Sequence, residues 1–116
     1  MPLITIRTNA HPDESTSTTL LQACSSQIAD LLGKPEQYVM TLLETVPAMT
    51  MSGSPAAACL LEVRSVGTIT PDQARAMSQA LCALTKEHLG VPSSRVYINF
   101  EGFSGSMWGY DGRTFG

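Results

Sequence analysis

The chain has 116 residues, a formal net charge of −3 and an apolar content of 43%. This length suits a single domain, residues 1–116, because two independent cores need a longer chain. Nucleic acid is not an expected partner, since the few Lys and Arg residues form no cluster that could bind phosphates. No membrane contact is expected either, because no apolar run approaches the roughly 20 residues that span a bilayer.

The N-terminal segment lacks the basic start and the apolar stretch of a secretory signal. We therefore expect a cytoplasmic protein, with release from cells by a route independent of a signal peptide left open. The three cysteines, Cys24, Cys59 and Cys82, form no CxxC pair, and only His11 and His88 accompany them. We expect structural thiols, no metal site and no cofactor.

The first half of the chain predicts a strand, a helix and a second strand. Residues 3–8 are rich in Leu, Ile and Thr, which suit a half-buried strand. A helix is predicted between residues 13 and 32, because apolar residues recur there with helical spacing. These residues are Leu20, Cys24, Ile28 and Leu31. Gly33 and Pro35 end the helix, and a strand follows at about 38–44.

The second half predicts the same order of elements. A strand is expected over residues 59–66, and a helix begins after Thr70, with Pro71 in its first position and Gln73 completing a capping box. The expected core stripe of this helix is Met77, Leu81, Leu84 and His88. Gly90 ends the helix, and a strand follows at about 95–101.

The two halves are copies of one unit, since the sequence repeats itself at an offset of 57 residues. Leu32-Gly33-Lys34-Pro35 returns as Leu89-Gly90-Val91-Pro92 at this offset. We predict a tandem duplication with repeat 1 at about 2–45, repeat 2 at about 59–102 and a tail at 103–116. Two βαβ units with right-handed crossovers give an α+β fold, a four-stranded mixed sheet with two helices on one face.

The second face of this sheet should be of mixed character. The polar residues expected there are Thr5, Arg7, Glu62, Arg64, Tyr97 and Asn99, and the apolar ones are Leu3, Met40 and Leu42. Such a face is too apolar to be left in water and too polar for a dry core. A cyclic oligomer whose sheets surround a shared interior would resolve this, with the glycine-rich tail docking across a subunit boundary.

Several motifs match a known family. They are Met1-Pro2 at the start of the first strand, Gly33-Lys34-Pro35 with Gln37-Tyr38, Arg95-Val96-Tyr97-Ile98-Asn99, and Thr114-Phe115. On these motifs, and over nearly its full length, the chain resembles the macrophage migration inhibitory factor family of the tautomerase superfamily, including its bacterial homologues. The resemblance implies a homotrimer with an active site between each pair of neighbouring subunits.

The resemblance also implies roles for individual residues. The catalytic base falls on Pro2, whose nitrogen is free once Met1 is removed, and the contact to a substrate carboxylate falls on Lys34. A backbone contact beside the base falls on Val66. The other implied substrate-binding positions are Tyr97 and Asn99 from the adjacent subunit, and Tyr110 and Phe115 at the apolar end of the pocket.

The implied function is keto–enol tautomerisation of phenylpyruvate-type 2-oxo acids and of dopachrome-like compounds. The chain departs from the family at the pocket, because Tyr110 replaces a tryptophan and Trp108 stands where a valine is usual. These departures leave the preferred substrate open. Receptor binding by a secreted, cytokine-like protein is the alternative function, and dehalogenation or decarboxylation is disfavoured because no suitable arginines or acid accompany Pro2.

An N-terminal proline suits proton transfer for a physical reason. The pKa of a free N-terminal amine is about 7.7–8.0, and burial with a nearby cation such as Lys34 lowers it toward the ambient pH, where a base works best. Without the resemblance, Pro2 could simply open a strand, and Lys34 could be a surface lysine after a helix end. Tyr97 and Asn99 could equally form hydrogen bonds at an interface.

Overall fold

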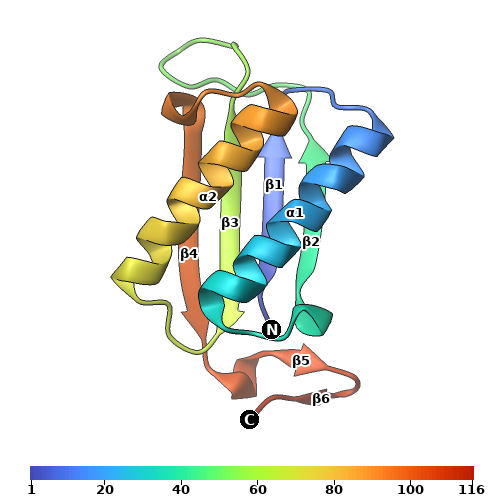
Figure 1. Ribbon diagram of the computed structural model, residues 1–116, viewed down its shortest axis with the longest axis vertical. Coiled ribbons are helices and arrows are strands. Elements are labelled where there is room, and N and C mark those ends of the chain that lie inside the picture. The colour runs from blue at the N-terminus through green and yellow to red at the C-terminus, as the bar shows by residue number, and fades with distance from the viewer.

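The computed structural model describes residues 1–116 as two α-helices, a four-stranded sheet and a short C-terminal hairpin (Figure 1). The main elements are β1 (Leu3–Thr8), α1 (Glu14–Leu32), β2 (Met40–Thr45), β3 (Cys59–Val66), α2 (Pro71–Leu89) and β4 (Val96–Phe103). The hairpin pairs β5 (Gly109–Tyr110) with β6 (Arg113–Thr114). Three 3-10 turns, η1 (Glu36–Tyr38), η2 (Ser93–Arg95) and η3 (Gly105–Met107), connect these elements.

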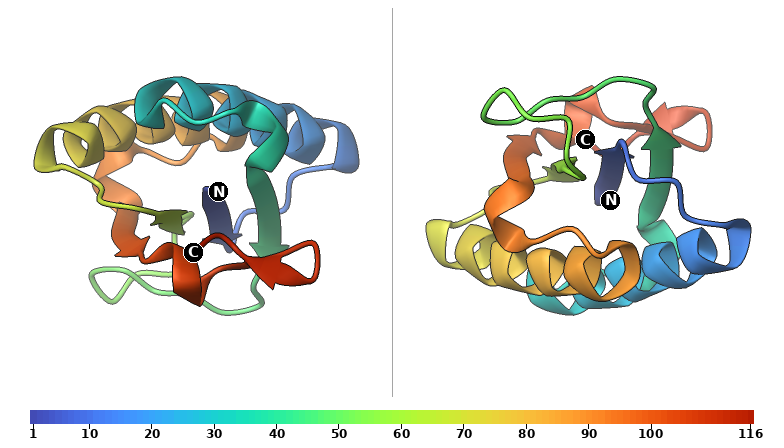
Figure 2. Two further views of the ribbon diagram at one scale, coloured as in Figure 1. Left: turned by 90° about the horizontal axis from the view of Figure 1, so that it is seen from below. Right: turned by 90° about the horizontal axis from the view of Figure 1, so that it is seen from above.

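The sheet has the strand order β2-β1-β3-β4. Strands β1 and β2 are parallel, as are β3 and β4, and the two units meet through the antiparallel pair β1 and β3. Both helices cover the same face of the sheet, as the end-on views of Figure 2 show. The predicted fold class, a mixed four-stranded sheet with two helices on one face, is confirmed.

The duplication is visible in the bounds of the helices and turns. Adding the offset of 57 to the bounds of α1 gives the bounds of α2, and adding it to η1 gives η2. Gly33 and Gly90 end the two helices in the left-handed conformation, with φ values of 64° and 69°. A side chain is rarely found in this conformation, so a glycine at each helix end is the expected choice.

The core lies between the helices and the inner face of the sheet. Alternate residues of the central strands point into it, among them Ile4, Ile6, Leu61 and Val63, which are fully buried. The capping box of α2 forms as predicted, with the Gln73 N–H donating to the Thr70 hydroxyl oxygen at 3.1 Å.

The predicted core stripe of α2 needs one correction. Met77 and Leu81 are fully buried and Leu84 packs against the core as expected, but Thr85 is also fully buried and His88 is only half-buried. Thr85 tolerates burial because its hydroxyl donates to the Cys82 carbonyl oxygen at 3.1 Å.

Two strands begin later than predicted. The sequence favoured strands from about residues 38 and 95, whereas β2 begins at Met40 and β4 at Val96. The 3-10 turns η1 and η2 occupy the intervening residues, each starting directly after a proline, Pro35 or Pro92. At its other end β4 runs on to Phe103, so the tail begins one residue later than expected.

The outer face of the sheet carries a row of charges that crosses all four strands. Arg7 on β1 pairs with Glu44 on β2 at 3.6 Å and with Glu62 on β3. Arg64 pairs with Glu62 at 2.8 Å and with Glu101 on β4 at 3.7 Å. Exposed apolar residues flank this row, including Met40 and Tyr97, which are 62% and 66% exposed. Neither helix combines the length and the apolar character that a membrane crossing requires.

Candidate active site

Pro2 lies directly before β1, at the end of the sheet where the chain both begins and ends (Figure 1). Its side chain is fully buried, and its carbonyl oxygen accepts a hydrogen bond from the Met40 N–H at 3.0 Å. Continuing the register of β1 and β3 places Pro2 opposite Ser65, next to Val66 at the end of β3. Pro2 is therefore fixed between the ends of two strands, β2 and β3.

The terminal amine at this end of the sheet has a lowered pKa. Partial burial and the positive charge of Lys34 lower the pKa of the amine below its ordinary value. In the unprocessed chain this amine belongs to Met1, and the nitrogen of Pro2 is part of a peptide bond. Removal of Met1 transfers the free amine to Pro2, closer to the strand ends that enclose it.

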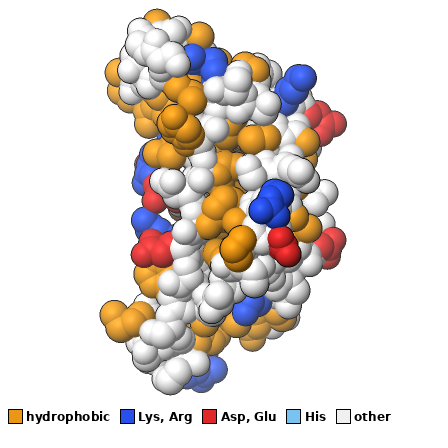
Figure 3. Space-filling model, turned by 90° about the vertical axis from the view of Figure 1, so that its left-hand side faces the viewer, with side chains coloured by type: hydrophobic (Ala, Val, Ile, Leu, Met, Phe, Trp, Pro, Cys, Tyr) orange, Lys and Arg blue, Asp and Glu red, His pale blue; other side chains and the backbone are white.

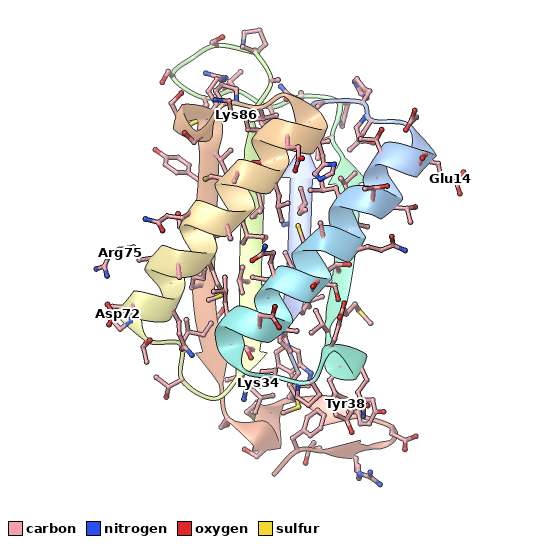
Figure 4. The ribbon with its side chains drawn as sticks, viewed as in Figure 1. Glu14, Lys34, Tyr38, Asp72, Arg75 and Lys86 are labelled. Atoms are coloured by element: carbon pink, nitrogen blue, oxygen red, sulfur yellow. The ribbon has the colours of Figure 1, made fainter.

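Lys34 reaches this region from the C-terminal end of α1. Its position follows from the left-handed turn at Gly33, after which the Lys34 N–H donates to the Ala29 carbonyl oxygen at 3.0 Å. The ammonium group lies beside Gly67, since a Cβ built on Gly67 would be 3.8 Å from Lys34 Nζ. Figure 4 shows Lys34 and Tyr38 at the same end of the molecule as the N-terminus. The structure thus brings Pro2, Lys34 and the backbone at Val66 into one region.

A cavity of about 320 Å³ opens at Pro2. It is lined by Pro2 and Leu3, by residues 37–40 and by residues 108–110. Its walls come from three separated segments, the start of β1, the turn before β2 and the start of the C-terminal hairpin. Six of its nine lining residues are hydrophobic, which suits the apolar part of a small ligand.

Aromatic rings close this cavity on the side of the hairpin. Tyr38 meets Tyr110 and Phe115 edge to face, with ring centroids 5.4 and 6.1 Å apart. Tyr110 stacks on Phe115 with centroids 5.4 Å apart and an interplanar angle of 14°. These contacts hold the tail against Tyr38 of its own chain. Tyr110 and Phe115 therefore lie in the region where the sequence placed the apolar end of the pocket.

Two predicted site residues, Tyr97 and Asn99, lie away from Pro2 within the chain. Tyr97 pairs with Leu60, which pairs in turn with Arg7, so that Tyr97 lies roughly 17 Å along the strands from Pro2. Asn99 is nearer, roughly 10 Å along, but it is on β4, two strands away. Both are exposed on the outer face. One chain alone does not bring these two residues to Pro2.

The structure adds two residues, Tyr38 and Trp108, to the predicted site. Tyr38 belongs to the Gln37-Tyr38 motif, and an aromatic residue four positions after Lys34 was the available signal for it. Trp108 was identified only as a departure in sequence, and nothing local indicated that it lines the cavity with Pro2. No three His, Cys, Asp or Glu side chains converge in a way that would hold a metal ion.

A larger hollow, of about 520 Å³, lies between α2 and β4 on the side shown in Figure 3, where apolar side chains gather along the middle. Cys82 and Lys86 line it. Burial raises the pKa of the Cys82 thiol, so the thiol stays protonated and is a poor nucleophile. The groups suited to proton transfer lie instead around Pro2.

Comparison with known proteins shows the family of the chain. The sequence profile of Macrophage migration inhibitory factor (MIF) matches residues 1–116. A macrophage migration inhibitory factor homolog of Trichuris trichiura is 37% identical over 115 residues, covering 99% of this chain and 100% of that protein. The crystal structure of the homologue from Prochlorococcus marinus has a TM-score of 0.91 at 40% identity, covering 98% of this chain and 99% of that one. The Toxoplasma gondii factor has a TM-score of 0.91 at 31% identity, covering 97% and 99%. The chain belongs to the macrophage migration inhibitory factor family.

Proposed function

We propose that the processed chain is a keto–enol tautomerase that acts on phenylpyruvate-type 2-oxo acids, with the Pro2 nitrogen as its base. The observation that carries this proposal is the buried end of the chain. Burial and Lys34 lower the pKa of the Met1 amine, and the next residue, Pro2, lines an apolar cavity with aromatic walls. A lower pKa favours the unprotonated form of the amine, which is the form that can accept a proton.

The reaction needs only proton transfers. The Pro2 amine takes a proton from C3 of the keto acid, and the electron pair of the broken C–H bond forms the C2–C3 double bond. The carbonyl π electrons move to the C2 oxygen, which takes a proton from water. The Pro2 ammonium then releases its proton to water, so substrate and product are isomers and no oxidant or reductant is consumed.

Lys34 and the aromatic residues have complementary roles in this proposal. The Lys34 ammonium binds the substrate carboxylate, and its charge also lowers the pKa of the neighbouring amine. The aryl group lies among Tyr38, Tyr110 and Phe115. The backbone at Val66, at the end of β3 beside Pro2, supplies a polar contact to the substrate.

We also propose that the active form is a homotrimer with sites between subunits. The outer face of the sheet supports this, because it combines a row of ion pairs with exposed Met40 and Tyr97 and is left uncovered by the helices. In such a ring, Tyr97 and Asn99 of one subunit would complete the site at Pro2 of the next. Dopachrome-like compounds form the second substrate class to be examined.

A cytokine-like role is the alternative function. Its support is family membership, since the Trichuris trichiura relative is named for inhibition of macrophage migration. This role would require release of the chain from the cell. A Pro2 variant tests the catalytic role, because the proposed catalysis requires the free Pro2 amine.

The test measures intact mass and phenylpyruvate tautomerisation on the same sample. Loss of one methionine together with activity is the expected result. Full activity with Met1 retained would refute the role of Pro2 as the base. The second arm is Pro2→Gly, which keeps a terminal amine but loses the secondary amine and its rigid ring. We expect its kcat/KM to fall by roughly 100-fold, within the range for general base catalysis. Wild-type activity in this variant would show that Pro2 is not the base.

A further inference from the structure

Trp108 forms part of the wall of the Pro2 cavity. Its backbone is extended, with φ −128° and ψ 108°, and the next two residues form β5. Alternate residues of an extended segment point to the same side, so Trp108 and Tyr110 both face the cavity, about 6.6 Å apart along the chain. The ligand space at Pro2 is therefore bordered by two aromatic side chains from one short segment.

Trp108 is held in place by contacts outside the cavity. Its ring meets Phe103 edge to face, with centroids 5.5 Å apart and an interplanar angle of 75°. Phe103 is the last residue of β4, so this contact ties the indole to the end of the sheet. The backbone N–H of Trp108 donates to the Gly105 carbonyl oxygen at 3.2 Å, and the Trp108 carbonyl oxygen accepts from the Phe115 N–H at 3.2 Å. Neither the ring nor the backbone can move aside without breaking these contacts.

The other aromatic wall is equally well supported. Tyr110 is stacked on Phe115 and meets Tyr38 edge to face, both at 5.4 Å between centroids. A ligand ring near Pro2 therefore meets two supported groups side by side, Trp108 with Phe103 and Tyr110 with its partners. A wider ring system would need one of the two groups to give way, and overpacked groups resist such shifts.

We propose that Trp108 is the specificity-determining residue of this site and makes it prefer, among aryl-substituted 2-oxo acids, those with a single aromatic ring. Bicyclic 2-oxo acids, such as indole-3-pyruvate, are disfavoured because the indole of Trp108 occupies the space that their second ring needs. This inference rests on the proposed tautomerase function and ranks the substrates within it.

The test compares kcat/KM for phenylpyruvate and indole-3-pyruvate in the wild type, in Trp108→Val and in Trp108→Phe. Valine suits an extended segment and shortens the wall, whereas phenylalanine keeps an aromatic wall and loses only the second ring and the N–H. We expect the preference for phenylpyruvate to fall about tenfold in Trp108→Val, a typical value for a change in pocket size. In Trp108→Phe it should change by less than about threefold.

Three outcomes would overturn the inference. One is an unchanged preference in an active, folded Trp108→Val variant. Another is a larger shift in Trp108→Phe than in Trp108→Val, which would show that the preference does not follow the size of the wall. The third is a wild type that already prefers indole-3-pyruvate. A wild-type chain without activity on either substrate, after confirmed removal of Met1, would instead refute the proposed function.

Discussion

Gly102 approaches the backbone near the active site so closely that a single methyl group should disturb both stability and catalysis. A Cβ built at Gly102 lies 2.3 Å from the Gly67 carbonyl oxygen. Real Cβ atoms essentially never come within 3.0 Å of another heavy atom, so Gly102→Ala must displace the backbone at Gly67 by at least 0.7 Å. The obstacle is a backbone carbonyl and not the flexible end of a side chain, so the displacement cannot be avoided by a rotamer change.

The displaced turn bears directly on the candidate site. The Gly67 N–H donates to the Phe103 carbonyl oxygen at 2.7 Å and closes the ladder between β3 and β4, while Lys34 Nζ lies against Gly67. We expect Gly102→Ala to lower the free energy of unfolding by about 1–3 kcal/mol, the usual cost of overpacking. Because Val66 and Lys34 move with Gly67, kcat/KM for phenylpyruvate should fall by roughly 10- to 100-fold in the fraction that stays folded.

Denaturant unfolding and a phenylpyruvate absorbance assay measure the two effects. Gly109→Ala is the matched control for stability, because its added Cβ meets only the Arg113 carbonyl oxygen, at an ordinary 3.7 Å. We expect this control to unfold within about 0.5 kcal/mol of the wild type. A Gly102→Ala protein with wild-type stability and wild-type activity would refute the close approach of the two turns and its link to Lys34.

Three further changes test other parts of the structure. Lys34→Gln should raise the pKa of the terminal amine, because a repelling charge is lost, and should move the rising limb of the pH profile of kcat/KM to higher pH. Its KM for phenylpyruvate should also rise roughly tenfold. If the rising limb of the pH profile does not shift, Lys34 does not influence the pKa of the base. Thr70→Ala should lower the free energy of unfolding by about 0.5–2 kcal/mol, because the Gln73 N–H at the start of α2 loses its acceptor; urea titration at one fixed protein concentration measures this. Burial raises the pKa of Cys24 to about 12, so at pH 8 iodoacetamide should label half-exposed Cys82 before Cys24, as followed by peptide mass spectrometry. The folded state holds the Cys24 thiol in its protonated form, and this contribution to the free energy of unfolding is complete below the ordinary thiol pKa near 9. It should shrink as the pH rises from there toward 12, because the unfolded chain loses this proton first. Labelling of Cys24 first would contradict its burial.

Much of the fold follows from local rules that act on short stretches of sequence. The helix of residues 71–89 begins and ends where Thr70 and Gly90 predict, because the capping hydrogen bonds and the left-handed turn each involve only a few neighbouring residues. Strand starts were less accurate. The turn after Pro35 satisfies its own backbone hydrogen bonds, from Tyr38 to Pro35 and from Val39 to Glu36, and so competes with the strand.

The proposed base and its cation could also be named from the sequence, through its resemblance to the family. Pro2 and Lys34 are each placed by a single local element, the start of β1 and the end of α1, and the duplicated unit brings both elements to the same end of the sheet. The repeat itself provides a further contrast, since Lys34 aligns with Val91 in the second copy, which is fully buried. The cation therefore belongs to one copy only.

The sequence by itself determined the duplication and the order of the elements, and its family resemblance named the residues proposed to carry the chemistry. Tertiary structure alone decided which residues share the cavity. Trp108 lies beside Pro2 only because the tail folds back along the sheet end and seats its ring on Phe103. The separation of Tyr97 from Pro2 likewise depends on the antiparallel register of β1 and β3. Both arrangements come from contacts between residues far apart in the chain, which local spacing does not encode.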